Sequence, residues 1–394
     1  MISVAEALTR VLDLVEPLPA EAVPLSESAG RVLAQDAVAQ RAQPPFAASS
    51  MDGYAVATEV HAGQVLHVIG QARAGEAFEG RLGPGEALRI FTGAPIPAGA
   101  IRVVMQEDVL REGDRITLGA GIGPRNNIRP AGADFAAGHR MAAPRRLRPA
   151  DLALLGAMNV ARPLVARRPE VALIATGDEL IMPGEIPGPD QIVASNLFAL
   201  KAMAEVEGAR VRLLPIARDT EAALSDVLDL AAGADVIVTI GGASVGEHDL
   251  VARVTEAKGA TRAFHRIALR PGKPLMSGRL GDAAFLGLPG NPVSAIVCGH
   301  LFLLPMLRKL QGLPAPEPKT LRATLAEDLE PNGVRSHYMR ARLLPGEDGL
   351  PRITAQPDQD SAMLVTLTQS DALLVRPAGD PARSRGEIVD YIPI

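Results

Sequence analysis

The sequence is poor in aromatic residues and carries no excess of positive charge. Aromatic side chains make up 3% of its 394 residues, and tryptophan is absent. Proteins that bind single-stranded nucleic acid stack the bases on aromatic side chains and track the backbone with a basic groove. A formal net charge of −5 offers no such basic surface. We therefore expect no nucleic-acid partner, and an anionic ligand would need a locally positive pocket.

The marks of an exported or membrane protein are also missing. The single cysteine, Cys298, cannot form a disulfide within the chain, and its apolar helical surroundings predict a buried thiol. Residues 1–6 show no basic segment followed by an apolar run. His300 and Pro305 interrupt the most apolar stretch, 296–307, and we predict that it is too short to span a bilayer. We expect a cytoplasmic protein with no membrane partner.

Several domains are expected, because a single core rarely grows past about 250–300 residues. Residues 3–16 carry apolar side chains at helical spacing, with Ser3 and Glu6 in a capping-box pattern. From about 44 to 143, glycine and proline separate short alternating runs, which is typical of a small antiparallel β domain. A second β-rich part follows the proline-rich segment 313–318.

Between these β-rich parts, residues 170–312 alternate strands with helices, and this alternation implies βαβ units and a mostly parallel sheet. In open sheets of this kind, ligands bind outside the carboxyl ends of the strands. We predict strands at 171–175, 211–214, 235–240 and 283–288, and helices at 195–207, 220–232, from 249 and from 292.

The most informative of the loops is 239–249, Thr-Ile-Gly-Gly-Ala-Ser-Val-Gly-Glu-His-Asp. A strand, a glycine-rich turn and a helix start form an arrangement whose backbone amides hold phosphate. Asp249 at its end is placed to hold a divalent cation against that phosphate. The loop has no Walker lysine and lacks the dinucleotide glycine spacing, so neither standard motif applies.

Three further loops leave this segment at the same predicted sheet edge. The acids of 176–180 suit a polarised ligand or a metal, although for this loop alone a capped turn is the favoured explanation. Arg270 and Lys273 flank a Pro-Gly turn that suits an oxyanion, with a solvated hairpin as the alternative. Asn291 as helix cap with Pro292 at the first helical position fully explains loop 288–294. Their convergence is what favours a phosphate-bearing ligand.

The β-rich segment contains three motifs that, by chemistry alone, are turns: 49–56, 91–97 and 127–134. Asp52 and Asp134 would serve in them as turn formers. His248 and His265 lack spaced Cys or His partners, which excludes the usual kind of zinc site. No Gly-x-Ser-x-Gly elbow or other nucleophile signature is present. The sequence therefore predicts a site that works by positioning its ligands and by the charge of a bound metal and of side chains, and not through a nucleophilic residue.

Taken in order, these motifs resemble the molybdopterin molybdenumtransferase family. Each motif alone is weak, but the ordered set is specific and spans essentially the whole chain. The segments that carry the resemblance are 44–46, 49–56, 92–95, 127–129, 176–180, 239–249, 271–274 and 288–294.

The resemblance implies a multidomain fold with an elongated linker domain at 1–43 and 139–168. It implies a small β-rich domain at 44–138, a three-layer α/β molybdopterin-binding domain at 169–313 and a C-terminal β-barrel at 314–394. It also implies a homodimer in which the partner's β domain completes the active site. On this basis Asp52, Thr92 and Asp134 become candidate binding residues.

The family's reaction uses adenylylated molybdopterin and molybdate with Mg²⁺ or a similar divalent cation, and it releases AMP and molybdenum cofactor. Carried over by motif position, Asp249 and Asp219 are the metal acids, and Glu179 is a further acid of the cleft. Lys273 completes the catalytic set. The remaining candidates for phosphate or oxyanion binding are Gly241, Gly242, Ser244, Gly246, Arg270, Pro274, Pro289, Pro292, Ser294, Arg340 and Ser361.

Two rival hypotheses remain at this stage. One is a molybdopterin adenylyltransferase-type activity, although that enzyme needs neither the β domain nor the C-terminal barrel. The other is a non-catalytic scaffold of the same fold, which the retained acids disfavour. A molybdopterin adenylyltransferase and apo-molybdoenzymes are the expected protein partners. Departures from the family's usual pattern include Ala133, Ala243 and Arg270.

Overall fold

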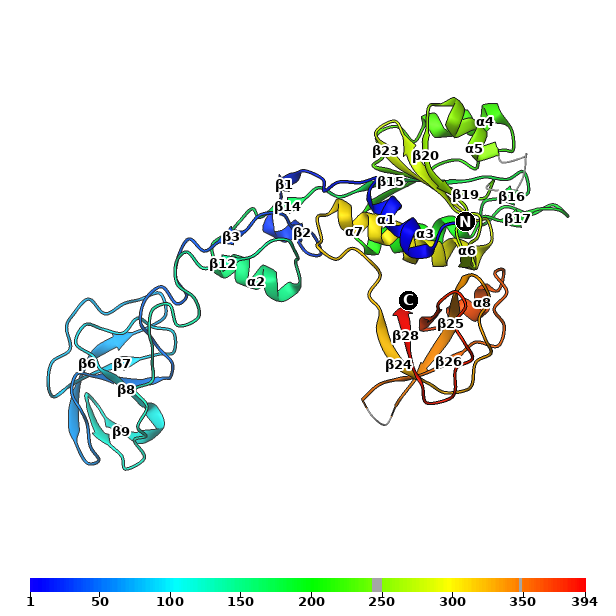
Figure 1. The fold of residues 1–394 in the computed structure, drawn as a ribbon. Helices are drawn as coiled ribbons and strands as arrows, with labels where there is room; N and C mark the ends of the chain where they lie inside the picture. The colour runs from blue at the N-terminus through cyan, green and yellow to red at the C-terminus, as the bar shows by residue number, and fades with distance from the viewer. Residues whose placement is uncertain (243–249, 347–348) are drawn as a thin grey trace.

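A computed structural model describes residues 1–242, 250–346 and 349–394. The molecule is elongated (Figure 1), with one β domain at one end and an α/β domain beside a C-terminal barrel at the other. The chain runs out along the connecting arm and returns along it. The predicted fold class, a mostly parallel α/β domain with β domains and a barrel, is confirmed.

The N-terminal helix α1 (Val4–Leu12) begins as the sequence predicts, because the Ser3 hydroxyl accepts a hydrogen bond from the Glu6 amide over 3.1 Å. It buries Val4, Ala7 and Val11 against the core of the α/β domain. The helix that the resemblance assigns to the linker domain thus packs into the core of the α/β domain, whose strands begin more than 150 residues later in the sequence.

The connecting arm is built from two antiparallel chain segments. Its four-stranded sheet has the order β1-β14-β2-β13, and a second pair joins β3 to β12. Helix α2 (Pro149–Ala157) and the short η1 (Leu25–Glu27) pack beside them around Leu155 and Met158. The strands are β1 (Ala20–Ala22), β2 (Val32–Leu33), β3 (Ala37–Val38), β12 (Arg140–Met141), β13 (Arg145–Arg146) and β14 (Leu164–Ala166).

The small β domain is a six-stranded sheet of order β8-β5-β7-β6-β10-β9. The prediction that it is antiparallel is wrong for one pair, because β6 and β7 run parallel. Thirteen residues, 73–85, separate them, and a connection of that length permits a crossover where a tight hairpin would not. The elements are β4 (Ala48–Ser49), β5 (Gly53–Val56), β6 (Val65–Ala72), β7 (Glu86–Ile90), β8 (Arg102–Met105), η2 (Gln106–Asp108), β9 (Val109–Glu112), β10 (Arg115–Leu118) and β11 (Ile128–Arg129).

The α/β domain has the strand order β18-β15-β19-β23-β22-β20, and the first four strands are parallel. One face packs on α3 (Asn196–Val206) and the helix that starts at Pro292, and the other packs on α4 (Glu221–Asp229) and α5 (Leu250–Ala257). These three layers match the prediction. The strands are β15 (Glu170–Ala175), β18 (Arg210–Leu213), β19 (Val236–Ile240), β20 (Thr261–His265), β22 (Met276–Leu280) and β23 (Ala283–Leu288), with β16 (Leu180–Ile181) and β17 (Ile192–Val193) as a separate pair.

The helix Pro292–Leu310 of this domain is long and apolar enough to cross a membrane by length and composition, and 78% of its apolar 18-residue window is buried inside the protein. The prediction that His300 and Pro305 break this stretch is wrong. The helix continues through α6 (Pro292–Cys298), a wider π turn η3 (Gly299–Leu303) and α7 (Leu304–Leu310). The wider turn accommodates Pro305, which has no N–H to donate. Burial accounts for the apolar sequence, and it raises the pKa of Cys298.

The C-terminal domain closes into a five-stranded ring, since β25 pairs with β27 as well as with β26. A sixth strand, β21 (Leu269–Arg270), comes from the α/β domain and pairs with β25. The barrel is thereby fixed to the loop that carries Arg270 and Lys273. Its elements are β24 (Leu321–Leu325), β25 (Ser336–Leu344), β26 (Arg352–Ala355), α8 (Leu364–Thr368), β27 (Ala372–Arg376) and β28 (Ile388–Pro393).

Candidate active site

A cavity of about 620 Å³ opens at the carboxyl ends of the parallel strands β15, β19 and β23. Because parallel strands end at one edge of a sheet, loops far apart in the sequence meet there. Eight of the predicted site residues line it: Glu179, Asp219, Gly241, Gly242, Pro274, Pro289, Pro292 and Ser294. The predicted convergence of the loops is therefore observed.

The acidic wall of this cavity is held by two loops that bond to each other. The Asp219 amide donates to Asp178 Oδ1 over 3.0 Å, and the Asp178 amide donates to Asp219 Oδ2 over 3.4 Å. Arg218 Nη1 reinforces the junction by donating to the carbonyls of Asp178 and Leu180. This exchange fixes Asp219 beside Glu179. Sequence reasoning considered Asp178 only as one of the two acids of its loop and did not predict its bond to Asp219, which lies 41 positions away.

The glycine turn after β19 passes very close to Thr176. Gly241 and Gly242 have φ values of 91° and 65°, in the left-handed region that favours glycine. A Cβ on Gly242 would lie 2.6 Å from Val251 Cγ2 and 2.7 Å from Thr176 Oγ1. Thr176 is 4% exposed and lines the cavity, and its hydroxyl has no hydrogen-bond partner within the described ranges. Ser244, Gly246 and Asp249 lie outside the described residues.

The start of helix α6 forms the opposite wall. Asn291 stands at the cap position with Pro292 at the start of the helix, as predicted, although its side chain makes no capping hydrogen bond. Its Nδ2 donates instead to Ser361 Oγ over 2.9 Å, and the Val293 amide donates to the Ser361 carbonyl over 3.0 Å. Barrel residue Ser361 therefore lies against the helix start. Ser294, in the first turn of the helix, is 4% exposed and lines the cavity.

Three predicted cations lie near the junction of the cavity domain and the barrel. Arg270 and Lys273 precede the cavity residue Pro274, and neither makes a side-chain hydrogen bond or ion pair within the part of the chain that the structure describes. Arg340 is 1% exposed, and its Nη1 donates to the carbonyls of Asp360 and Met363. Burial lowers the pKa of Arg340, while Asp358 and Asp360 oppose that shift.

The other predicted residues lie in the β domain, at the far end of the molecule from this cavity (Figure 1). Asp52 Oδ1 accepts hydrogen bonds of 2.7 Å from both the amide and the hydroxyl of Thr92. These two bonds, with a smaller contribution from the charge of Arg89, hold the pKa of Asp52 below its usual value. Asp134 is exposed. One chain alone does not bring these three residues to the cavity.

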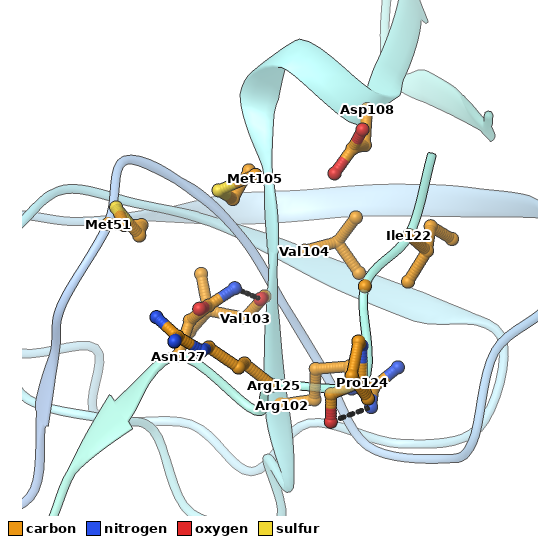
Figure 2. A pocket seen from close by; sticks show the side chains of 11 residues that line it. Met51, Arg102, Val103, Val104, Met105, Asp108, Ile122, Pro124, Arg125 and Asn127 are labelled. Atoms are coloured by element: carbon orange, nitrogen blue, oxygen red, sulfur yellow. Dashed lines mark hydrogen bonds between the residues drawn. The ribbon is translucent and has the colours of Figure 1, made fainter. Parts of the chain in front are cut away.

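A second cavity, of about 390 Å³, lies in the β domain beside edge strand β8, and sequence reasoning missed it. Figure 2 shows Val104 and Ile122 within it, with Asp108 toward one end and Arg125 toward the other. Asn127 Nδ2 donates to the Val103 carbonyl over 2.9 Å, which holds the covering segment onto the strand. The lining of this cavity is largely apolar.

Three family models match successive parts of the chain. They are the MoeA N-terminal region (domain I and II) over residues 2–158, the probable molybdopterin binding domain over 172–309 and the MoeA C-terminal region (domain IV) over 322–394. A molybdopterin molybdenumtransferase of Nostoc is 35% identical, covering 100% of this chain and 94% of its own. The chain belongs to the molybdopterin molybdenumtransferase family.

Other molybdopterin molybdenumtransferases are also similar to this chain over most of their length. The relative from Haemophilus influenzae is 33% identical over 100% of this chain and 98% of its own. Molybdopterin molybdenumtransferase 2 of Mycobacterium tuberculosis is 36% identical over 87% of this chain and 88% of its own. A solved structure, the molybdopterin biosynthesis MoeA protein of Pyrococcus horikoshii, superimposes with a TM-score of 0.84 at 29% identity, covering 100% of this chain and 99% of the other.

Membership in the molybdopterin molybdenumtransferase family makes the chain a transferase of molybdenum cofactor biosynthesis, and molybdenum insertion is the activity of the family. The resemblance stated from the ordered motifs is confirmed. Molybdopterin and molybdate fit this family as substrates.

Proposed function

We propose that the protein inserts molybdenum from molybdate into adenylylated molybdopterin at the 620 Å³ cavity and releases AMP and molybdenum cofactor. The observation that carries this proposal is that the cavity has two chemically different walls. Carboxylates and the glycine turn form one, and the start of helix α6 with the Ser294 hydroxyl forms the other, while the cations Arg270 and Lys273 lie outside the lining in the turn that precedes Pro274. Such a site accommodates two anionic substrates at once, each held by its own set of groups.

The acidic wall is the nucleotide side in this proposal. Gly241 and Gly242 line the cavity, and their lack of a Cβ allows the turn to pack closely against Thr176. Their backbone amides would bind phosphate in this proposal. Ser244 and Gly246 would extend this cradle. Glu179 and Asp219 supply the hard oxygen donors that Mg²⁺ prefers.

In this proposal the divalent cation is bound partly by carboxylates of the protein and partly by phosphate oxygens of the substrate. Within residues 1–242, 250–346 and 349–394 no group of three or more His, Cys, Asp or Glu gathers to form a complete cage. Mg²⁺ is commonly held by one or two carboxylates together with substrate phosphates and water. Asp219 and Asp249 would hold it, and the bound ion would neutralise charge on the phosphate.

The opposite wall is the oxyanion side. Ser294 offers a buried hydroxyl, and Pro289 and Pro292 shape the helix start around it. Ser361 and Arg340 come from the barrel, while Lys273 and Arg270 come from the turn that β21 anchors to β25. Guanidinium, ammonium and hydroxyl groups are suited to a tetrahedral oxyanion such as molybdate.

A homodimer completes the site in this proposal. Asp52 of the partner subunit, with Thr92 and Asp134 of the partner subunit, would reach the cavity from a β domain that is too distant within one chain (Figure 1). We further propose that the enzyme works in the cytoplasm. It would receive its substrate from a molybdopterin adenylyltransferase and deliver cofactor to apo-molybdoenzymes.

The test is a defined reaction with purified protein, adenylylated molybdopterin, molybdate and Mg²⁺. We expect AMP release and active cofactor, and we expect Asp249→Ala to abolish both while the variant stays folded. Wild-type rates in that variant would contradict the metal role of Asp249. Pyrophosphate release from ATP and molybdopterin would favour the adenylyltransferase alternative. Absence of both reactions would favour the scaffold alternative.

A further inference from the structure

Asp52 is held at its backbone as well as at its carboxylate, and a single arginine links the backbone contacts. Arg89 Nη1 donates to the Gly53 carbonyl over 3.1 Å, and Arg89 Nη2 donates to Gln106 Oε1 over 2.6 Å. The backbone N–H of Gln106 donates to the Asp52 carbonyl over 3.1 Å. Arg89 thus holds the Gly53 carbonyl directly and binds the side chain of the residue whose backbone holds the Asp52 carbonyl, while Thr92 fixes the carboxylate.

Two aromatic rings hold the Arg89 guanidinium in place. Its central carbon lies 5.1 Å from the centroid of Tyr54 and 4.7 Å from that of Phe91. Arg73 lies over Phe91 at 5.8 Å. A guanidinium over aromatic faces is attracted by their quadrupoles and loses rotational freedom. The ordering of Arg89 is therefore established before any ligand arrives.

Arg89 stands close to Asp52 without forming an ion pair with it. Both Thr92 donors use Asp52 Oδ1, and Asp52 Oδ2 has no hydrogen bond or ion pair within the described part of the chain. An arginine that bonded the carboxylate directly would occupy that oxygen. Here its hydrogen bonds go to neighbouring carbonyl groups instead, so Oδ2 stays available.

We propose that Arg89 is a positioning residue of the active site: it orients Asp52 so that Oδ2 faces outward to accept a hydrogen bond from the substrate. This inference rests on the proposed role of Asp52 in the dimeric site. Arg89 itself does not need to touch the substrate. Its contribution is geometric, and small misplacements of a reacting or positioning group lower turnover strongly.

The experiment measures the steady-state kcat and KM of molybdenum insertion for Arg89→Gln, with Arg115→Gln as the matched control. Arg115 is an exposed arginine of the same sheet whose side chain has no partner among the described residues. We expect kcat of Arg89→Gln to fall on the order of 100-fold with a much smaller change in KM. Arg115→Gln should match the wild type. Equal rates for the two variants would overturn the inference.

A double-mutant cycle separates positioning from general structural support. If Arg89 acts through Asp52, then Arg89→Gln adds no further loss in an Asp52→Asn background. Additive losses would contradict the inference. Arg89→Lys keeps the charge but cannot bond both acceptors, so we expect it to recover only part of the rate. If Arg89→Gln does not fold, Gln106→Leu removes the Arg89 Nη2 bond while it keeps the backbone bond to Asp52. Its kcat should then fall in the same direction but by less, and an unchanged kcat would contradict the inference.

The inference and the proposed function fail in different ways. If Asp52→Asn keeps the wild-type rate, the proposed role of Asp52 is wrong and Arg89 has nothing to position. If Asp52→Asn loses activity while Arg89→Gln does not, only the role of Arg89 is wrong.

Discussion

Asn291 of the α/β domain donates its Nδ2 hydrogen to Ser361 Oγ of the C-terminal barrel over 2.9 Å, and this contact joins two domains beside the cavity. We expect Asn291→Ala to lower stability by about 1 kcal/mol, the usual contribution of one hydrogen bond. Ser361→Ala removes the same bond and, in the proposed function, also a molybdate contact. The KM for molybdate should therefore rise more in Ser361→Ala than in Asn291→Ala. Equal KM values would limit Ser361 to joining the domains.

Gly242 tests the close approach of the glycine turn. Alanine there would combine an unfavourable φ of 65° with a Cβ 2.6 Å from Val251 Cγ2. Gly233 has a φ of 81° and open space around its Cβ position, so Gly233→Ala carries the backbone strain alone. We expect a loss of about 1–3 kcal/mol for Gly233→Ala with activity retained. Gly242→Ala should lose more stability and most activity; similar behaviour of the two variants would contradict the packing argument.

Thr176 and Thr239 form a matched pair of buried threonines whose hydroxyl groups lack partners within the described ranges. Only Thr176 lines the cavity. Replacing a buried unsatisfied hydroxyl by a methyl group costs little stability or increases it. We therefore expect both valine variants to keep their melting temperature. Thr176→Val should weaken binding of the adenylylated substrate in a titration, and Thr239→Val should not. An unchanged affinity in Thr176→Val would exclude the hydroxyl as a ligand contact.

His337 makes the protein sensitive to mild acid. Burial lowers its pKa to about 4, and Arg270, Arg340, Arg376 and Arg335 add to that shift. In the unfolded chain His337 binds a proton near pH 6.5, whereas in the folded chain it does so only near pH 4. The free energy of unfolding therefore falls as the pH drops from about 6.5 toward 4. Between pH 7 and 5 this amounts to roughly 2 kcal/mol.

Urea unfolding at pH 7 and pH 5 measures this acid sensitivity. His337→Gln should show a smaller loss of stability between the two values than the wild type. His300, whose pKa is also lowered to about 4 by burial and by Arg308, retains its own contribution in that variant. An identical loss in the variant and the wild type would contradict the assignment.

Local signals in the sequence predicted much of this fold. Ser3 and Glu6 define the start of α1, and Thr220 caps α4 by accepting from the Ala223 amide, because such bonds join residues three apart. Strand β19 is recognisable as an apolar run because a parallel strand is buried on both faces. The parallel order of the sheet then follows from alternation with helices.

Contacts between distant residues account for what the sequence left undetermined. The partner of Asn291 lies 70 positions away, and the partner of Asp178 lies 41 away. No periodicity encodes either pairing, so the sequence predicts the cap position of Asn291 but not the barrel hydroxyl that its side chain binds. The parallel β6–β7 pair depends on how the loop between them crosses, which composition does not specify. The roles proposed for Asp52 and Arg89 depend on a three-dimensional network that local patterns do not contain.

The most direct test of the central claim compares Asp219→Asn with Asp226→Asn in molybdenum insertion by purified protein. Asp219 lines the cavity, whereas Asp226 is an exposed acid on helix α4 that makes no side-chain bond within the described residues. Both changes remove one negative charge and alter the shape very little. We predict that Asp219→Asn loses AMP release and cofactor formation together, while Asp226→Asn keeps both. Full activity in Asp219→Asn would contradict the account.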